Sequence, residues 1–153
     1  MPQDSDHEKA SRAAFYTDGF SIDDLEFRPF SLATYDHVQS FGIQALLGQG
    51  EAVEDERTFL FQIIALAWAL FEDPAVVDEL ALDLDFAEDE DERREFEKDL
   101  RRRVLALKGR LTLEALPKLV SKIREMCEQI AAVDFEVKEK PNDADEESPP
   151  GNS

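Results

Sequence analysis

The acidic run from Asp83 to Glu92 (DLDFAEDEDE) is the densest set of potential metal ligands in the chain. Ca²⁺ prefers carboxylate oxygens, and a helix–loop–helix calcium loop that began at Asp83 would need Asp or Asn at position 87 and Gly at position 88. The chain has Ala87 and Glu88 at these positions. The run therefore predicts the solvated start of a helix, with a weak, nonspecific divalent cation site as the alternative.

Nucleophilic catalysis would need a thiol or hydroxyl beside a base. The chain has one cysteine, Cys127, and two histidines, His7 and His37, so a Cys127–His37 pair could in principle act in this way. Cys127, however, falls on the apolar face of a predicted helix, where a buried inert thiol is the usual state. Neither histidine lies in an HExxH motif or beside another ligand at metal spacing, so no zinc site is expected.

Other patterns that could support catalysis are incomplete. Gly48-Gln49-Gly50 resembles the opening of a dinucleotide-binding loop, but Val53 stands where the third glycine belongs and no strong strand precedes the loop. The carboxylates show no spacing that singles out a general acid and a general base. We therefore expect no catalytic residue, no cofactor and no bound metal, and hence a protein that is not an enzyme.

The charge of the chain narrows the classes of partner. Of its 153 residues, 36 are acidic and 17 are basic, which makes the net charge −19 at pH 7. A field of this sign repels the phosphates of nucleic acids and anionic membranes, and it attracts basic partners. We therefore expect a protein partner, and neither a nucleic acid nor a membrane.

Cysteine use and the N-terminal sequence indicate a compartment. A single cysteine excludes an internal disulfide and fits a reducing environment. The first residues, MPQDSDHEKASRAAF, are polar and acidic and lack the basic and apolar regions of an export signal. Both features predict a cytoplasmic protein.

The apolar run from Phe59 to Phe71 (FLFQIIALAWALF) contains a single polar residue, Gln62. It is shorter than the roughly 18 to 20 residues that span a bilayer, and its acidic flanks lack the Lys and Arg anchors of a membrane helix. We therefore expect a buried central helix. Trp68 within it is either an anchor of the core or, if exposed, a strong contact for a partner.

A short helix is predicted before this run. Ser31 suits an N-cap, and a helix from Leu32 to Phe41 would end at Gly42. Its apolar face is expected to consist of Leu32, Tyr35, Val38 (or Gln39) and Phe41. The preceding segment from Phe20 to Phe30 could be extended, but its apolar residues do not alternate cleanly enough to predict a strand.

Two further helices are predicted after the apolar run. Asp73 caps the first and Pro74 begins it, because proline is accepted at the first helical position, and the helix continues to about Leu82. The second follows the acidic run, continues to about Lys108 and stops at Gly109. Its narrow apolar stripe consists of Phe96, Leu100, Val104 and Leu107.

The last predicted helix is the most regular. After Thr112, apolar residues recur at alternating steps of three and four, which is the pattern of a helix in a bundle. They are Leu113, Leu116, Val120, Ile123, Cys127 and Ile130. We expect this face to pack against the helix of Phe59 to Phe71, with the seam of a homodimer as the alternative.

Together these elements predict an all-α fold. It would be a small bundle of about five helices around a central apolar helix, with disordered acidic termini. Residues 1–19 are expected to be a mobile N-terminal segment, residues 20–137 a helical domain, and residues 138–153, which lack apolar periodicity, a disordered acidic tail.

The segment from Phe27 to Tyr35 (FRPFSLATY), with a short helix and a glycine-containing loop after it, resembles the start of small tail assembly chaperones of tailed phages and prophages. The apolar helix with Trp68 and the closing Leu116-Pro117 helix also fit, so the resemblance extends over residues 25–135. It implies a small, non-enzymatic helical protein that binds the long apolar helices of a tape-measure protein in the host cytoplasm. It carries over no catalytic residue and no tape-measure contact.

Two functions therefore remain open. The first is a helical interaction protein, with a tail assembly chaperone as its specific form, and it predicts an exposed apolar groove near Phe59 to Phe71 or near the short helix. The second is an acidic mimic of nucleic acid that inhibits a DNA- or RNA-binding protein, and it predicts regular rows of carboxylates. The residues expected to bind a partner are Tyr35, Phe41, Phe59, Trp68 and Phe71.

Overall fold

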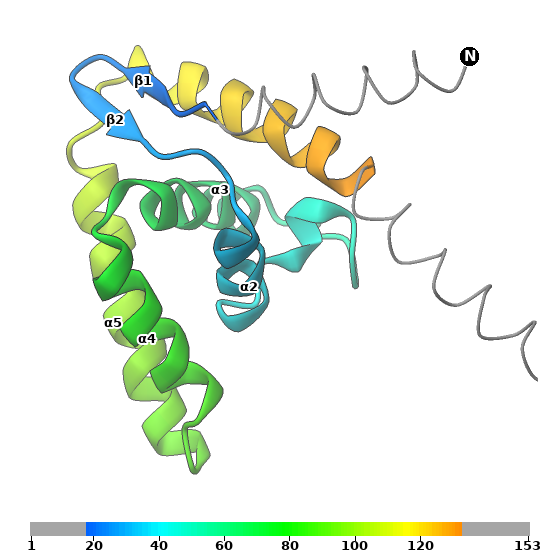
Figure 1. Ribbon diagram of the computed structural model, residues 1–153, viewed down its shortest axis with the longest axis vertical. Coiled ribbons are helices and arrows are strands. Elements are labelled where there is room, and N and C mark those ends of the chain that lie inside the picture. Colours follow the sequence, from blue (N-terminus) through cyan, green and yellow to red (C-terminus); the bar gives the residue numbers. More distant parts are fainter. Residues whose placement is uncertain (1–17, 133–153) are drawn as a thin grey trace, which may run out of the picture.

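One helix, α3 (Glu56–Phe71), lies at the centre of the structure, and other elements pack around it (Figure 1). The computed structural model describes residues 18–132, so the predictions made for residues 1–17 and 133–153 lie outside the described part. Every residue from Ile63 to Leu70 has an exposed fraction of 2% or less. A helix that is apolar on every side has to be covered on every side. The expected central buried helix is confirmed.

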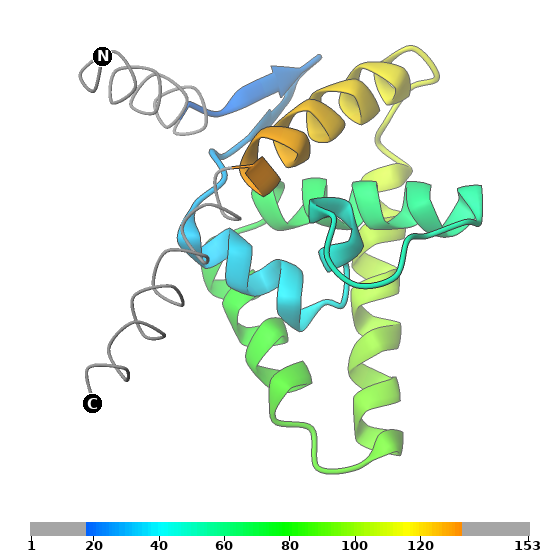
Figure 2. The same cartoon turned by 90° about the vertical axis from the view of Figure 1, so that its right-hand side faces the viewer.

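Further helices in the described part surround α3. They are α2 (Leu32–Ser40), the 3₁₀ helix η1 (Gln44–Leu47), α4 (Pro74–Asp85), α5 (Glu90–Lys108) and a last helix over residues 115–132. The last helix lies on one side of α3, whereas α4 and α5 extend away from it and are joined at their far end by a short loop (Figure 1, Figure 2). None of the described helices combines the length and the apolarity needed to cross a membrane.

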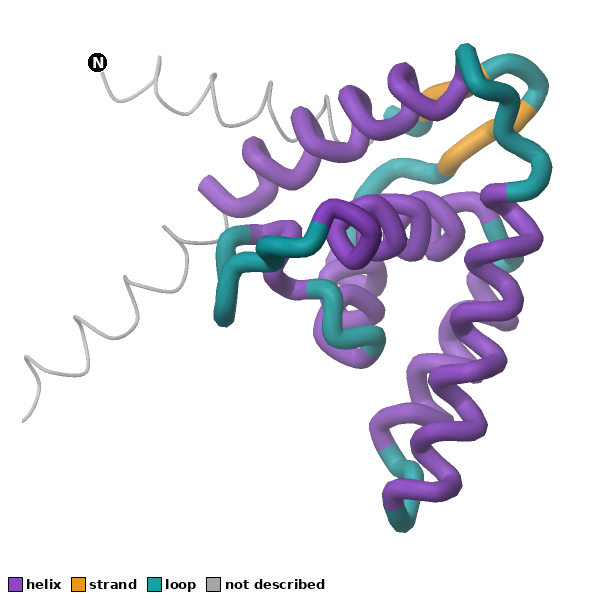
Figure 3. The backbone as a smooth tube through the Cα atoms, turned by 180° about the vertical axis from the view of Figure 1, so that it is seen from behind, coloured by secondary structure: helices purple, strands orange, loops and turns teal. Residues whose placement is uncertain are grey.

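A short β-hairpin lies at the edge of the helices (Figure 3). Its strands β1 (Phe20–Ile22) and β2 (Leu25–Phe27) are antiparallel, with Ile22 opposite Leu25. Asp23 has a φ of 56°, which is the left-handed conformation of a tight two-residue turn. The sequence did not predict strands here because the turn interrupts the alternation. Ile22 and Leu25 are three residues apart, yet they face the same side and are both buried.

Helix α2 begins where it was predicted, and its packed face matches the prediction at Tyr35, Val38 and Phe41 but not at Leu32. Ser31 and Thr34 form a reciprocal capping box, and Gly42 with a φ of 70° follows the last turn. Leu32 was expected on the buried face, but it is 86% exposed. The buried residues of α2 are Thr34, His37 and Val38. This prediction was wrong at Leu32 because the helix packs against α4 as well as α3, which turns the first residue outward.

Helices α4 and α5 start close to their predicted positions. The side chain of Asp73 accepts a hydrogen bond at the start of α4, and Pro74 is the first residue of the helix. The helix continues to Asp85, almost one turn beyond the predicted end at Leu82. Gly109 directly follows α5, as expected. The buried stripe of α5 consists of Leu100, Val104 and Leu107, with Phe96 half-buried beside it.

The last helix begins later than predicted. The hydroxyl of Thr112 accepts a hydrogen bond from the N–H of Ala115 at 3.0 Å, and Leu113 lies in the turn before the helix. Leu113 was expected on the packed face, but it is 91% exposed because it precedes the helical register. The residues that this helix buries are Ala115, Leu119, Ile123, Met126 and Cys127. They join the core cluster that contains α3, as expected.

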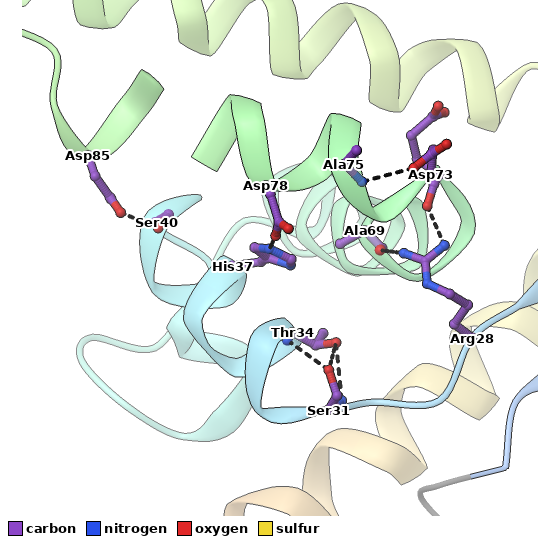
Figure 4. A network of polar contacts seen from close by, with 11 residues as sticks. Arg28, Ser31, Thr34, His37, Ser40, Ala69, Asp73, Ala75, Asp78 and Asp85 are labelled. Carbon is purple, nitrogen blue, oxygen red and sulfur yellow. Dashed lines mark hydrogen bonds and ion pairs between the residues drawn. The ribbon is translucent and has the colours of Figure 1, made fainter. Parts of the chain in front are cut away.

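Arg28 connects the hairpin to the C-terminal end of α3 (Figure 4). Its backbone N–H donates to the carbonyl of Leu70 at 2.8 Å, and its guanidinium donates to the carbonyl of Ala69 at 2.7 Å and to that of Glu72. The last carbonyls of a helix lack partners within the helix and carry partial negative charge. The guanidinium therefore satisfies the end of α3 and fixes the chain that leads into α2.

Candidate functional site

A surface groove of about 500 Å³ lies between α2 and α4. Helix α2 contributes five lining residues and α4 four, and four on each helix have the spacing i, i+3, i+4 and i+7, which is one face of a helix. They are Ala33, Asp36, His37 and Ser40 from α2, and Asp78, Ala81, Leu82 and Asp85 from α4; Gln39 completes the lining. The groove is therefore formed by one whole face of each helix.

Two side-chain contacts join the walls of the groove (Figure 4). His37 Nε2 lies 2.6 Å from Asp78 Oδ1, and Ser40 Oγ donates to Asp85 Oδ2 at 2.9 Å. The two contacts follow in the same order along both helices, so α2 and α4 point in the same general direction. His37 is 8% exposed, and its ring stacks on Phe41 with 6.0 Å between centroids. These contacts hold the two walls at a defined separation.

The groove is acidic. Asp36, Asp78 and Asp85 are exposed lining residues. Neither α2 nor α4 contains Lys or Arg, since the sequence has none from 29 to 56 or from 58 to 92. The ion pairs of Lys and Arg on α5 involve carboxylates of α5 itself. The three aspartates therefore have no Lys or Arg on either wall of the groove, and the one imidazole beside them is that of His37, 2.6 Å from Asp78.

Many basic side chains of the described part have other contacts. Arg93 of α5 reaches the end of α4, but it donates to the carbonyl of Leu84 at 3.0 Å and lies 3.4 Å from Glu97. Others lie over aromatic rings of α3 and β1, at 5.2 to 6.0 Å from the ring centroids. These cation–ring pairs are Arg101 with Phe61, Arg110 with Phe71, Lys122 with Phe20 and Arg124 with Phe59.

Leu82 supplies exposed apolar surface inside this acidic groove. It is 56% exposed, and the small residues Ala33 and Ala81 line the same groove. Phe86, which is 75% exposed, comes one residue after Asp85, at the C-cap of α4. Single exposed apolar residues are ordinary on a protein surface. Here, however, a leucine and three carboxylates share one concave surface, which can combine apolar and ionic contacts.

The polar residues of the groove are not arranged for nucleophilic catalysis. A serine nucleophile needs a hydrogen bond to the histidine that takes its proton. In the groove, Ser40 instead donates to Asp85, while His37 is engaged with Asp78. Within residues 18–132, no group of three or more His, Cys, Asp or Glu side chains could hold a metal ion.

Two of the predicted partner-binding residues, Phe59 and Phe71, lie at opposite ends of α3 and are half-buried. The guanidinium of Arg124 lies 5.6 Å from the ring centroid of Phe59, and that of Arg110 lies 5.2 Å from the ring centroid of Phe71. Such contacts cover aromatic faces and contribute about 0.5–1 kcal/mol at exposed sites. Neither ring lines the groove.

The other three predicted residues do not line the groove either. Tyr35 is half-buried, and its hydroxyl accepts a hydrogen bond from Gln49 at 3.1 Å. Phe41 is half-buried against Trp68, with ring centroids 6.0 Å apart. Trp68 itself is 2% exposed, so the structure places it in the core. A partner could reach it only after the surrounding helices had moved apart.

Cys127 and His37 do not form a pair. Cys127 lies on the last helix beside Ile63 of α3 and Leu46 of η1, whereas His37 contacts Asp78 in the groove. Burial raises the pKa of the Cys127 thiol to about 12, and the nearby charge of Glu128 acts in the same direction. A thiol with this pKa is a poor nucleophile at neutral pH, so the expected inert state fits its environment.

The acidic run from Asp83 to Glu92 contains the end of α4, a short loop and the start of α5. Asp89 Oδ1 accepts a hydrogen bond from the N–H of Glu92 at 2.8 Å, and Glu92 Oε1 accepts one from the N–H of Glu88 at 2.9 Å. These carboxylates cap the exposed N-terminus of α5, where negative charge is favourable. The interpretation as a solvated helix start agrees with this geometry.

Sequence reasoning missed the residues that line the groove. One signal was available: Asp78, Ala81, Leu82 and Asp85 follow the spacing of one helix face, and this face has an apolar residue between two carboxylates. The predicted helix ended at about Leu82, so Asp85 was not placed on it. The sequence predicted an apolar groove near Phe59 to Phe71 or near the short helix, whereas the groove beside α2 is lined in part by carboxylates and by none of the apolar residues of the expected face.

Comparisons of this chain with protein-family models, with curated proteins and with solved structures find no match.

Proposed function

We propose that this chain is a non-enzymatic interaction protein that holds a segment of another protein in the groove between α2 and α4. The observation that carries the proposal is the groove, where exposed Leu82 lies among three carboxylates on two connected helices. A helix laid into a groove is a recurring mode of recognition, in which apolar anchors supply much of the affinity. The side-chain contacts between α2 and α4 prepare the surface before the partner arrives.

A tail assembly chaperone that binds apolar helical segments of a tape-measure protein is the specific form of this proposal. The resemblance over Phe27 to Tyr35 supports it, because this segment leads into α2 and includes Ala33 of the groove. A small protein of this kind would shield an apolar segment until its assembly partner replaced it.

The distribution of charge on α5 favours this function over the acidic mimic of nucleic acid. A mimic needs rows of carboxylates, but on α5 acidic and basic side chains alternate at helical spacing. The pairs at i, i+3 are Asp91 with Arg94, Glu95 with Lys98 and Asp99 with Arg102. Such pairs interrupt a row of negative charge on α5, whereas no Lys or Arg lines the groove between α2 and α4.

The test is co-expression of the chain with candidate tape-measure segments, followed by pull-down. Leu82→Asp should reduce capture about tenfold, because one leucine contact is worth about 1.5 kcal/mol. The matched control is Leu105→Asp, since Leu105 is 52% exposed on α5 and does not line the groove. If Leu82→Asp and Leu105→Asp captured equal amounts of the segment, the assignment of the groove as the binding site would be refuted. Capture of basic nucleic-acid-binding proteins alone, reversed by about 0.5 M salt, would support the mimic instead.

A further inference from the structure

We infer that the segment held in the groove is a basic amphipathic helix, with an apolar side chain on Leu82 and Lys or Arg side chains on both sides of it. This inference rests on the function proposed above and adds the chemistry of the partner. It follows from the charge of the groove, from the spacing of its carboxylates and from the position of Leu82 between them.

Charge complementarity selects a basic partner over a neutral one. Binding of a purely apolar segment would remove Asp36, Asp78 and Asp85 from water, which is unfavourable for ionised groups. The contacts of Asp78 with His37 and of Asp85 with Ser40 each involve one carboxylate oxygen and would replace only part of the lost water contacts. An acidic segment would add repulsion. Lys or Arg side chains would replace the lost water contacts with ion pairs, and α2 and α4 offer no such side chain themselves.

The spacing along α4 defines where the basic residues belong. Asp78 and Asp85 are seven residues apart, which corresponds to about 10 Å along a helix that rises 1.5 Å per residue. Leu82 lies between them on the same face. A partner helix packed along α4 therefore matches this pattern with basic residues at i and i+7 and an apolar residue at i+3 or i+4. Asp36 on α2 can accept a third basic side chain from the opposite wall.

The inference can be tested with a library of helical peptides of about 14 residues, or four turns. In an alanine-rich background, four positions at i, i+3, i+4 and i+7 are randomised, and peptides are selected on the full chain. Selection is repeated on the Leu82→Asp variant, and peptides that bind the wild-type chain but not this variant are those bound through the groove. Those that depend on Leu82 should be enriched in Lys or Arg at i and i+7 and in Leu, Ile or Phe between them.

The affinities of the selected peptides are then measured by fluorescence anisotropy. Replacing both basic residues with Gln should weaken binding about three- to tenfold, as expected for two exposed ion pairs. The double variant Asp78→Asn/Asp85→Asn should bind the original basic peptides more weakly than the wild-type chain by the same factor. The control Glu114→Gln/Glu125→Gln changes the net charge equally on exposed positions outside the groove and should retain full affinity.

The outcomes separate the two proposals. If Leu82-dependent peptides carry neutral or acidic residues at i and i+7, the groove binds a segment but the inferred chemistry is wrong. If no selected peptide depends on Leu82, the proposed function of the groove itself is refuted. If the wild-type chain instead forms a dimer that Leu82→Asp abolishes in sedimentation velocity, the occupant is a second copy of this chain, and the basic-helix inference is overturned.

Discussion

Replacement of Arg28 tests whether one side chain stabilises the end of α3 and the approach to α2. In Arg28→Met, the aliphatic part of the side chain is largely kept, but the guanidinium that donates to the carbonyls of Ala69 and Glu72 is lost. The backbone hydrogen bond to Leu70 does not involve the side chain and can persist. The variant therefore isolates the contribution of the guanidinium.

The expected loss can be estimated from the two contacts. A hydrogen bond to a charged group contributes about 1.5–3 kcal/mol when buried, and a cation at a helix C-terminus contributes about 0.3–1 kcal/mol. Arg28 is half-buried, and water can replace part of the lost interaction. We therefore expect Arg28→Met to reduce the free energy of unfolding by about 2–4 kcal/mol. Arg28→Lys keeps the charge but loses the planar group that donates to two carbonyls at once, and it should lower the free energy of unfolding by about half as much.

The measurement is urea denaturation followed by far-ultraviolet circular dichroism at pH 7. Arg94→Met is the matched control, because Arg94 is 62% exposed at its side chain and its ion pair with Asp91 is 3.5 Å long. That change should stay within about 0.5 kcal/mol of the wild type, as is usual for surface ion pairs. If Arg28→Met were as mild as the control, the guanidinium would contribute nothing measurable, and our account of how the chain is anchored to α3 would be wrong.

Two further predictions concern the core. Trp68→Ala should lower the free energy of unfolding by about 3–5 kcal/mol, as is usual when a buried tryptophan is truncated. The control Leu113→Ala, at a 91% exposed position, should change it by less than about 0.5 kcal/mol. If Trp68→Ala lowered the free energy of unfolding as little as the control in the same urea titration, Trp68 would not be a core residue. Burial raises the pKa of Cys127 from 9.0 to about 12, so the folded state holds this proton more tightly than the unfolded state does. The resulting stabilisation is complete below pH 9 and is lost as the pH rises towards 12, and Cys127→Ala should flatten this part of the stability profile. The thiol should also react with a disulfide reagent at pH 8 only after unfolding; rapid labelling of the native protein would contradict its burial.

The Trp68 prediction affects the choice of variant for binding experiments. Trp68 was one of the residues expected to contact a partner, and its replacement by alanine is an obvious first test. Because Trp68 is buried beside Phe41, a loss of binding in that variant would report a loss of folded protein. Leu82 is exposed, so its substitution can change binding while the core stays intact.

Local signals were sufficient to predict where several elements begin and end. Ser31 caps α2, Pro74 starts α4 and Gly109 follows α5, because these preferences arise from backbone geometry within a few residues. Local signals failed where a turn changed the register. The turn at Asp23 hid the hairpin, and the turn before Ala115 removed Leu113 from the packed face of the last helix.

By itself, the sequence determined that the chain has a helical core. The run from Phe59 to Phe71 is apolar on every side, and burial of such a helix requires other elements on all sides of it, whatever their arrangement. The acidic character of the surface was equally certain, because 36 acidic residues oppose 17 basic ones.

Only the tertiary structure decided which helix faces meet. Packing on α3 places α2 beside α4, so that His37 contacts Asp78 across 41 residues of sequence and Ser40 contacts Asp85 across 45. Helical periodicity shows which residues share a face of one helix, but it cannot show which other helix lies opposite that face. The groove, with Leu82 among its carboxylates, exists because two faces that are distant in sequence come together when α3 is buried.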